Sequence, residues 1–299
     1  MQHAPSRTAM SRLALLSAAL LLSASACQTS RPDTATGDAT GGYAGEMRHQ
    51  HSGETPTASG AAAGAHALPV TSETVTYATV GGQSVRGTLV TPRGGAPGLP
   101  GIIVVHEWWG LNDNVRAMAA RYANEGYAVL AVDLYGGQAA TTPDAAMSLM
   151  QAAFAAPDAQ RDNLRQAHAF LTARGAARVG VLGWCFGGNR ALEAALALPA
   201  DLDAAVIFYG GNPPSDPAPL RALRMPVLGL YGGADTSIPQ TAVAAFDAAL
   251  TQAGVAHEFH VYPGAGHAFA NPSGQSYDAT AATDAWTRAT AFLAENLKG

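Results

Sequence analysis

The chain has 299 residues and a formal net charge of −5, with no basic patch that could neutralise nucleic-acid phosphates. Hydrophobic residues make up 48% and charged residues only 13%, a balance typical of a globular protein with a substantial core. Beyond the N-terminus no run of about 18 apolar residues occurs, so the sequence predicts no internal membrane span.

The first residues have the composition of a secretory signal. Arg7 and Arg12 supply positive charge, and residues 13–24 form an apolar stretch that is too short for an ordinary transmembrane helix. Small residues that end at Ala26 precede the expected cleavage point. The sequence therefore predicts a signal peptide over residues 1–26 and export of the mature chain to the cell envelope or periplasm.

The residues around Cys27 allow two ways of processing. Cleavage after Ala26 would release a soluble protein, whereas small residues directly before a cysteine resemble a lipobox, in which Cys27 becomes the lipidated N-terminal residue. Ala24 stands where a lipobox usually has Leu. A lipid on Cys27 is the only membrane attachment that we expect, and we expect the protein to be a monomer.

Residues 27–67 are rich in Thr, Ser, Gly and Ala and contain almost no large apolar side chains. Such a segment cannot bury enough apolar surface to order itself, so we expect a flexible linker. His49 and His51 lie within it. Two histidines without further ligands indicate solvated side chains rather than a metal site.

From residue 68 to residue 299, strands and helices alternate regularly. Residues 74–80 and 84–91 flank Gly81-Gly82 and alternate apolar with polar side chains, which predicts a β-hairpin. Apolar runs predict further strands at residues 101–106, 127–133, 178–183, 204–209, 226–231 and 257–262. Helical patterns occupy residues 114–125, with Asn112 or Asp113 as the cap, and residues 143–155, 159–174, 187–198, 239–253 and 280–297.

This alternation predicts one α/β domain over residues 68–299, with a mostly parallel central sheet that helices cover on both faces. Several of the strands are short and almost wholly apolar, as expected of strands buried on both sides. In such folds functional residues gather at the carboxyl ends of the parallel strands. Candidate functional residues should therefore directly follow predicted strands.

Cys185 is the candidate nucleophile. It lies in the sequence GWCFGG (residues 183–188), whose glycine spacing matches the strand-to-helix nucleophile turn of α/β-hydrolases. The sharp turn leaves no room for side chains two residues before and after the nucleophile. The N-terminus of the following helix favours negative charge on sulfur and on a nearby oxyanion. The sequence thus predicts an α/β-hydrolase fold with a cysteine nucleophile.

Asp235 and His267 are the candidate partners of this nucleophile. Asp235 ends the sequence YGGAD after a predicted strand, and His267 lies in the glycine-rich sequence PGAGHAF after the next one. The order nucleophile, acid, histidine is the order expected for an α/β-hydrolase. Imidazole can raise the thiolate fraction near neutral pH, and a carboxylate orients the ring and stabilises the imidazolium.

The chain contains only two cysteines, Cys27 and Cys185. A disulfide between them is one interpretation, since an oxidising compartment favours disulfides. If Cys27 instead carries lipid, Cys185 is a lone thiol in an exported protein, which favours a chemical role.

Together these sequences resemble the dienelactone hydrolase family, from about residue 68 to the C-terminus. The resemblance rests on HEWWGLN (residues 106–112), DLYGG (133–137), GWCFGG (183–188), FYGG (208–211), YGGAD (231–235) and PGAGHAF (263–269). It implies an ester or enol-lactone substrate, opened through an acyl-thiol intermediate that water hydrolyses, with no cofactor and no metal.

The resemblance also implies roles for further residues. Glu107 would contact the thiol and take its proton as substrate binds, and Tyr209 would line the pocket. The backbone N–H groups of Trp108 and Phe186 would form the oxyanion hole. Apart from the resemblance, a carboxylate that directly follows an apolar strand, as Glu107 does, is costly to bury and needs polar neighbours such as a functional site.

The sequence departs from the dienelactone-cleaving members at their carboxylate-binding positions. Ala268 and Asn271 stand where Ser and Arg are expected, and residues 141–156 contain no Arg or Lys. Because an arginine clamp is hard to replace, we expect a neutral or apolar ester rather than a carboxylated dienelactone. Apolar walls for such a substrate are available from Trp108, Trp109, Trp184 and Phe186.

Other functions remain open from the sequence. The same three residues could serve an acyltransferase or a thioesterase, because the sequence does not distinguish acyl acceptors. A non-catalytic, envelope-tethered binding module would predict the loss of a triad residue, and none is lost. A redox-responsive thiol at Cys185 would require a resolving cysteine, and none lies near it in the sequence.

Overall fold

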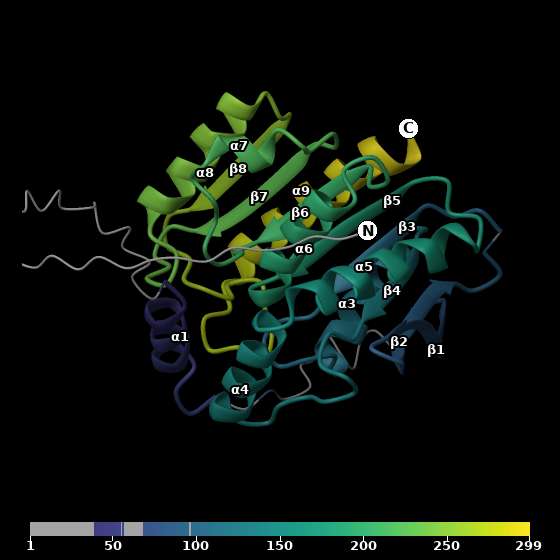
Figure 1. Cartoon of the computed structure of the whole chain (residues 1–299), viewed down its shortest axis with the longest axis horizontal. Coiled ribbons are helices and arrows are strands. Elements are labelled where there is room, and N and C mark those ends of the chain that lie inside the picture. Colours follow the sequence, from purple (N-terminus) through teal and green to yellow (C-terminus); the bar gives the residue numbers. More distant parts are fainter. Residues whose placement is uncertain (1–38, 55, 57–67, 96) are drawn as a thin grey trace, which may run out of the picture. The chain divides into compact units, whose positions relative to one another are not determined.

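The computed structural model describes residues 39–54, 56, 68–95 and 97–299 (Figure 1). The predicted signal peptide over residues 1–26 and the predicted lipid attachment at Cys27 lie outside the described residues, and so does the alternative of a Cys27–Cys185 disulfide. These predictions therefore stay untested by the structure.

The predicted hairpin is confirmed. Strand β1 spans Val70–Val80 and β2 spans Gln83–Pro92, and they pair antiparallel with Val80 opposite Gln83. Gly81 and Gly82 between them have φ angles of +56° and +80°, which side chains other than glycine rarely tolerate. This turn fixes the register as far as Ala78, and a bulge between Thr76 and Ala78 shifts the rest of the ribbon by one residue.

The central sheet of the described chain has eight strands in the order β1-β2-β4-β3-β5-β6-β7-β8. Its parallel part consists of β3 Gly101–Val105, β4 Ala128–Val132, β5 Val179–Trp184, β6 Ala204–Phe208, β7 Val227–Gly232 and β8 His257–Tyr262. Only the pairings β1–β2 and β2–β4 are antiparallel. Strands β3, β5, β6 and β7 are buried along their whole length, because helices cover both faces of the sheet. The predicted mostly parallel sheet is confirmed.

Helices flank this sheet on both faces (Figure 1). They are α3 Asp113–Asn124, α5 Pro157–Thr172, α6 Phe186–Ala197, α8 Gln240–Ala253 and α9 Ala279–Lys298. Helix α4 Pro143–Phe154 packs against α5, and the short α7 Pro217–Leu220 packs against α8. The Asn112 side chain accepts a hydrogen bond from the Val115 N–H at 3.1 Å, which confirms it as the cap of α3. Helices α3 and α9 share one face, where the rings of Tyr122 and Trp286 lie 4.4 Å apart. Helices α5 and α6 pack against each other on the sheet.

The expected flexible linker contains an ordered helix, α1, over Ala39–Gln50. Met47 is fully buried, and His51 and Glu54, just after α1, are buried as well. The expectation that His51 is solvated is therefore wrong. Met47 and a set of polar contacts to the domain hold this segment, although its composition predicts little burial. We call residues 39–54 the strap.

Candidate active site

The candidate functional residues meet at the carboxyl ends of the parallel strands, as the sequence predicts. Glu107 follows β3, Cys185 follows β5 and Tyr209 follows β6. Asp235 follows β7 and His267 follows β8. Parallel strands end at the same edge of the sheet, so five separate segments contribute to one site.

Cys185 occupies a strained turn between β5 and α6. Its backbone has φ +56° and ψ −117°, a conformation that non-glycine residues adopt only where the surrounding structure enforces it. A Cβ atom on Gly183 would lie 2.2 Å from the Gly187 carbonyl oxygen, and one on Gly187 would lie 2.3 Å from the Val105 carbonyl oxygen. The two glycines are thus required by close backbone contacts, as predicted.

His267 and Asp235 form a buried pair, because the Nδ1 atom of His267 lies 2.7 Å from Oδ2 of Asp235. The other oxygen, Oδ1, accepts hydrogen bonds from the Ser237 N–H, the Ser237 hydroxyl and the Ile238 N–H. Although burial alone would raise the pKa of Asp235, the charge of His267 and these hydrogen bonds lower it. Asp235 is therefore ionised and rigidly held, as a group that orients an imidazole must be.

The electrostatic environment of His267 connects it to Cys185. Burial alone would lower the pKa of His267, but the charges of the Cys185 thiolate and of Asp235, with hydrogen bonds to both, raise it to about 10. The arrangement thus favours the positively charged imidazolium form of His267. Both side chains are nearly inaccessible, with Cys185 at 1% and His267 at 2% exposure.

Glu107 lies in the same site among polar neighbours. Its carboxylate accepts a hydrogen bond from the Tyr209 hydroxyl at 3.3 Å and one from the Asn271 side-chain amide at 2.6 Å. Burial raises the pKa of Glu107 to about 7, and the negative charge of Glu54 adds to the increase. Near neutral pH this carboxyl group can therefore both release and accept a proton.

The structure gives Asn271 a function that the sequence does not reveal. Its amide nitrogen donates to Glu107, and its oxygen accepts hydrogen bonds from the Ser273 N–H and the Ser273 hydroxyl. Asn271 thus ties the loop after His267 to the carboxyl group at the end of β3. From the sequence it stands out only by occupying the position where the family resemblance leads us to expect Arg.

The other predicted site residues border the same region. Phe186 is the first residue of α6, so its backbone N–H has no partner within the helix. The rings of Trp108 and Trp109 are buried and lie 4.8 Å apart. Trp184, at the end of β5, is also buried and lines a pocket together with Glu107 and Tyr209. All the predicted pocket residues therefore lie around the candidate triad.

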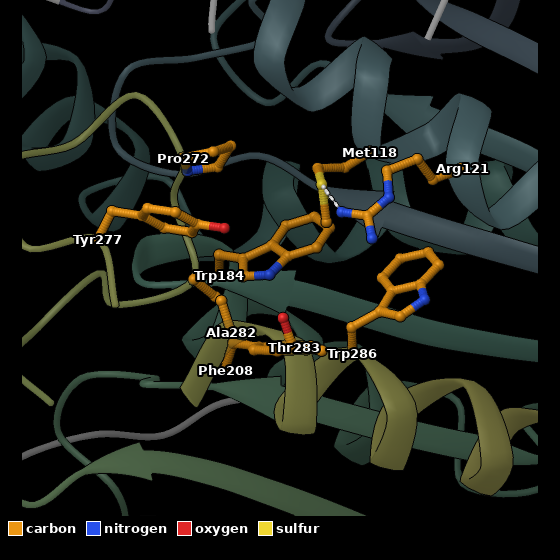
Figure 2. Close-up of a pocket in the computed structure, with 10 residues that line it drawn as sticks. Met118, Arg121, Trp184, Phe208, Pro272, Tyr277, Ala282, Thr283 and Trp286 are labelled. Atoms are coloured by element: carbon orange, nitrogen blue, oxygen red, sulfur yellow. Dashed lines mark hydrogen bonds between the residues drawn. The ribbon is translucent and has the colours of Figure 1, made fainter. Parts of the chain in front are cut away.

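Two adjoining pockets lead away from Glu107. The inner one holds about 20 Å³ and is lined by Glu107, Tyr209 and Asn271, among others. The outer one holds about 80 Å³, and Met118 and Trp184 line both. Figure 2 shows the indole of Trp184 in this outer pocket, between the ring of Tyr277 and the side chains of Met118 and Arg121. The inner space is at the scale of a single water molecule, so a substrate must widen it.

The strap brings a second histidine–carboxylate pair to the site, which the sequence does not predict. Nδ1 of His51 lies 2.5 Å from Oε2 of Glu54. The His51 ring lies 4.8 Å from the ring of Trp108 and 6.0 Å from that of His267, between ring centroids. Spacing relative to other motifs could not reveal these two residues, because the segment around them has a low-complexity composition.

Within residues 39–54, 56, 68–95 and 97–299, no group of three or more His, Cys, Asp or Glu side chains could hold a metal ion. Across the same ranges no helix is both long and apolar enough to span a membrane.

Comparison with known families gives a match over most of the chain. The sequence profile of the dienelactone hydrolase family matches residues 85–297. An inferred carboxymethylenebutenolidase of Saccharolobus solfataricus is 31% identical over 252 residues, which cover 71% of this chain and 94% of the relative. Another from Methylorubrum extorquens is 37% identical over 211 residues, which cover 66% and 72%, respectively.

Solved structures show the same similarity. An inferred dienelactone hydrolase of Klebsiella pneumoniae aligns with a TM-score of 0.68 and 29% identity, covering 76% of this chain and 99% of that protein. A dienelactone hydrolase-like promiscuous phosphotriesterase, P91, from metagenomic libraries aligns with a TM-score of 0.70 and 28% identity over the same shares. These neighbours have the α/β-hydrolase fold that the sequence predicts.

Proposed function

The chain belongs to the dienelactone hydrolase family, and we propose that it hydrolyses an ester or lactone bond through Cys185, His267 and Asp235. The observation that carries this proposal is the buried His267–Asp235 pair beside a cysteine on a strained strand-to-helix turn. A thiolate–imidazolium pair at a helix N-terminus is a nucleophile in its active form.

In the first step the Cys185 sulfur attacks the carbonyl carbon of the substrate, and a tetrahedral intermediate with a negatively charged oxygen forms. As this intermediate collapses, the bond to the leaving oxygen breaks and His267 donates its Nε2 proton to that oxygen. The acyl group then remains bonded to sulfur. Asp235 holds the imidazole in orientation and stabilises its positive charge before the transfer.

In the second step water attacks the acyl-thiol. His267, now neutral, takes a proton from this water, and the carbon–sulfur bond breaks to release the acid and restore the thiolate. The net reaction adds one water to the substrate, giving an acid and an alcohol, or a hydroxy acid if the substrate is a lactone. No cofactor is required for either step.

Glu107 and two backbone groups complete the proposed mechanism. With its pKa near 7, Glu107 can accept the thiol proton when substrate binds to a protonated Cys185. The backbone N–H groups of Trp108 and Phe186 would stabilise the oxyanion, Phe186 from the first turn of α6. Removal of one such donor typically costs catalysis about a hundredfold or more.

The proposed substrate is a neutral ester with an apolar acyl group. The pocket between Glu107 and Trp184 is lined by apolar and uncharged side chains besides Glu107 itself. Neither lysine nor arginine lines it, and Asn271 binds Glu107 instead of presenting a positive charge. An acyl chain could extend along Trp184 toward Met118 and the outer pocket (Figure 2).

Hydrolysis of p-nitrophenyl butyrate by the full chain tests this function. We expect turnover by the wild type and by Cys27→Ala, and a loss of at least about a thousandfold in Cys185→Ala, because the covalent step disappears. Addition of methanol separates hydrolase from acyltransferase, since a transferase would yield mainly methyl butyrate. Turnover that persists in Cys185→Ala would contradict the triad.

We also propose that the protein is exported and, through Cys27, attached to a membrane by lipid. The proposal is supported by the basic and apolar stretch before Cys27 and by the small residues at positions 24–26. Expression with radiolabelled palmitate should label the wild type but not Cys27→Ala. Secretion of an unlabelled wild type, cleaved after Ala26, would contradict the lipid anchor while leaving export intact.

A further inference from the structure

The strap is fixed to the domain beside the catalytic aspartate. Near the end of α1, the Gln50 amide donates to the Thr236 hydroxyl at 2.5 Å, and this hydroxyl donates to Glu46. Thr236 directly follows Asp235. Further along, the Glu54 carboxylate accepts the Gln275 N–H at 2.9 Å, in the loop that also carries Asn271. The strap thus joins two loops of the active site.

His51 is held so that one ring nitrogen remains available in the site. Its Nδ1 atom contacts Glu54, and the ring packs against Trp108. The residue is only 5% exposed, and among the described residues its Nε2 atom has no hydrogen-bond partner. A buried polar nitrogen without a partner is costly, which suggests that a bound molecule completes it.

Glu54 adds a negative charge to this region. Burial alone would raise the pKa of Glu54, but hydrogen bonds from His51 and Gln275 and the charges of His51 and His267 lower it. The carboxylate is close enough to act electrostatically on both His267 and Glu107. A second carboxylate brought by a substrate would therefore meet repulsion beside Glu107, where no lysine or arginine lines the inner pocket, since Arg121 lines only the outer one.

We propose that the strap is part of the substrate site, in which His51 donates a hydrogen bond from Nε2 to the bound ester while Glu54 orients His51 and excludes carboxylated substrates. The inference rests on the proposed ester hydrolysis and names its substrate class as neutral esters with a hydrogen-bond acceptor near Trp108. Because Nδ1 of His51 already faces the Glu54 carboxylate, donation from Nε2 as well uses the doubly protonated ring, in which both nitrogens are donors.

A matched pair of substrates tests both roles in the full chain. p-Nitrophenyl butyrate and p-nitrophenyl hemisuccinate have acyl groups of equal carbon number, and only the second carries a carboxylate. Kinetic constants are measured for the wild type, His51→Phe and Glu54→Gln. Phenylalanine keeps an aromatic ring against Trp108 but removes the nitrogen donor. His49→Phe is the control, because His49 is exposed in the same strap. Thermal unfolding of each variant verifies that it is folded.

We expect His51→Phe to lower kcat/KM for both esters about tenfold, the usual value of one buried hydrogen bond, and His49→Phe to change neither. Glu54→Gln should raise kcat/KM for the hemisuccinate relative to the butyrate about tenfold by relieving charge repulsion. If kcat/KM of His51→Phe is unchanged or higher for both esters, the strap merely covers the site and the proposed hydrogen bond is contradicted. If Glu54→Gln leaves the ratio of kcat/KM for the hemisuccinate to that for the butyrate unchanged, Glu54 does not exclude carboxylated substrates. Absence of wild-type turnover would instead count against the hydrolase function itself.

Discussion

Two histidine–carboxylate pairs reach the same site from different parts of the chain. His267 and Asp235 follow strands β8 and β7 of the sheet, whereas His51 and Glu54 follow helix α1 in the strap. In both pairs Nδ1 of the imidazole contacts a carboxylate oxygen, at 2.7 Å and 2.5 Å respectively. All four side chains are buried. Similar local geometry thus arises on two very different supports.

The supports differ in how firmly they hold the carboxylate. Asp235 receives three hydrogen bonds from the turn that follows it, whereas Glu54 receives one from the backbone outside its own segment, at Gln275. Proton transfer requires geometry fixed to within about half an ångström, which strand ends provide. A helix joined to the domain by side-chain contacts suits the selection of substrates better than their chemistry.

The largest effect should follow from breaking the sheet-borne pair. We expect His267→Ala to lower kcat by at least about a thousandfold, because the Cys185 thiolate loses its imidazolium partner and the hydrolytic water loses its base. His51→Phe should cost only about tenfold. Stopped-flow and steady-state hydrolysis of p-nitrophenyl butyrate measure both. Losses of equal size would mean that the two pairs share one role and that the comparison fails.

Replacing a glycine by alanine should affect the free energy of unfolding much more under Cys185 than in the strap. Gly187→Ala would place a Cβ atom 2.3 Å from the Val105 carbonyl oxygen, so the turn under Cys185 must shift. We expect a loss of several kcal/mol in unfolding free energy or failure to fold. Gly45→Ala in the strap meets no atom within 4 Å and should change stability by about 1 kcal/mol or less. Chemical denaturation of the wild type and of both variants measures these changes in the free energy of unfolding.

The buried carboxyl group of Glu107, at the end of β3, should make the stability of the protein depend on pH. Because the folded pKa is raised from 4.5 to about 7, the protein loses stability as pH rises from about 4.5 to about 7, and the loss is complete above pH 7. Glu107→Gln should therefore gain stability over the wild type across that window, by up to about 3 kcal/mol. Thermal unfolding at several pH values measures the gain.

Glu73→Gln is the control for this pH series, because Glu73 is exposed on β1. It should show no gain in that window. A Glu107→Gln variant whose stability relative to the wild type does not depend on pH would mean that Glu107 ionises normally, and its proposed role as an acceptor of the thiol proton would lose its support.

The smallest effect concerns acyl length. Met118 lines both the inner and the outer pocket, so Met118→Ala should widen the connection between them. We expect kcat/KM for p-nitrophenyl octanoate to rise about fivefold relative to the butyrate, through the added apolar contact. A ratio that stays constant would place the acyl chain elsewhere, for instance beside Trp109 and the strap.

The sequence predicts one pair and not the other for physical reasons. The fold and the positions of Cys185, Asp235 and His267 follow from strand periodicity and from glycines that close backbone contacts require. The strap lacks such signals, because its order depends on Met47, His51 and polar contacts with residues far along the chain. Likewise, Asn271 can be recognised as the partner of Glu107 only once the loop after His267 is placed.

The acyl-thiol on Cys185 is tested most directly by intact-mass analysis of the full chain quenched in acid during turnover of p-nitrophenyl butyrate, followed by peptide mapping. The account predicts a mass increase of one butyryl group on Cys185 in the wild type, formed within the initial burst. It predicts no adduct in Cys185→Ala, and far slower formation in His267→Ala. Steady turnover with the butyryl group on another residue would contradict the account, and so would full activity of Cys185→Ala.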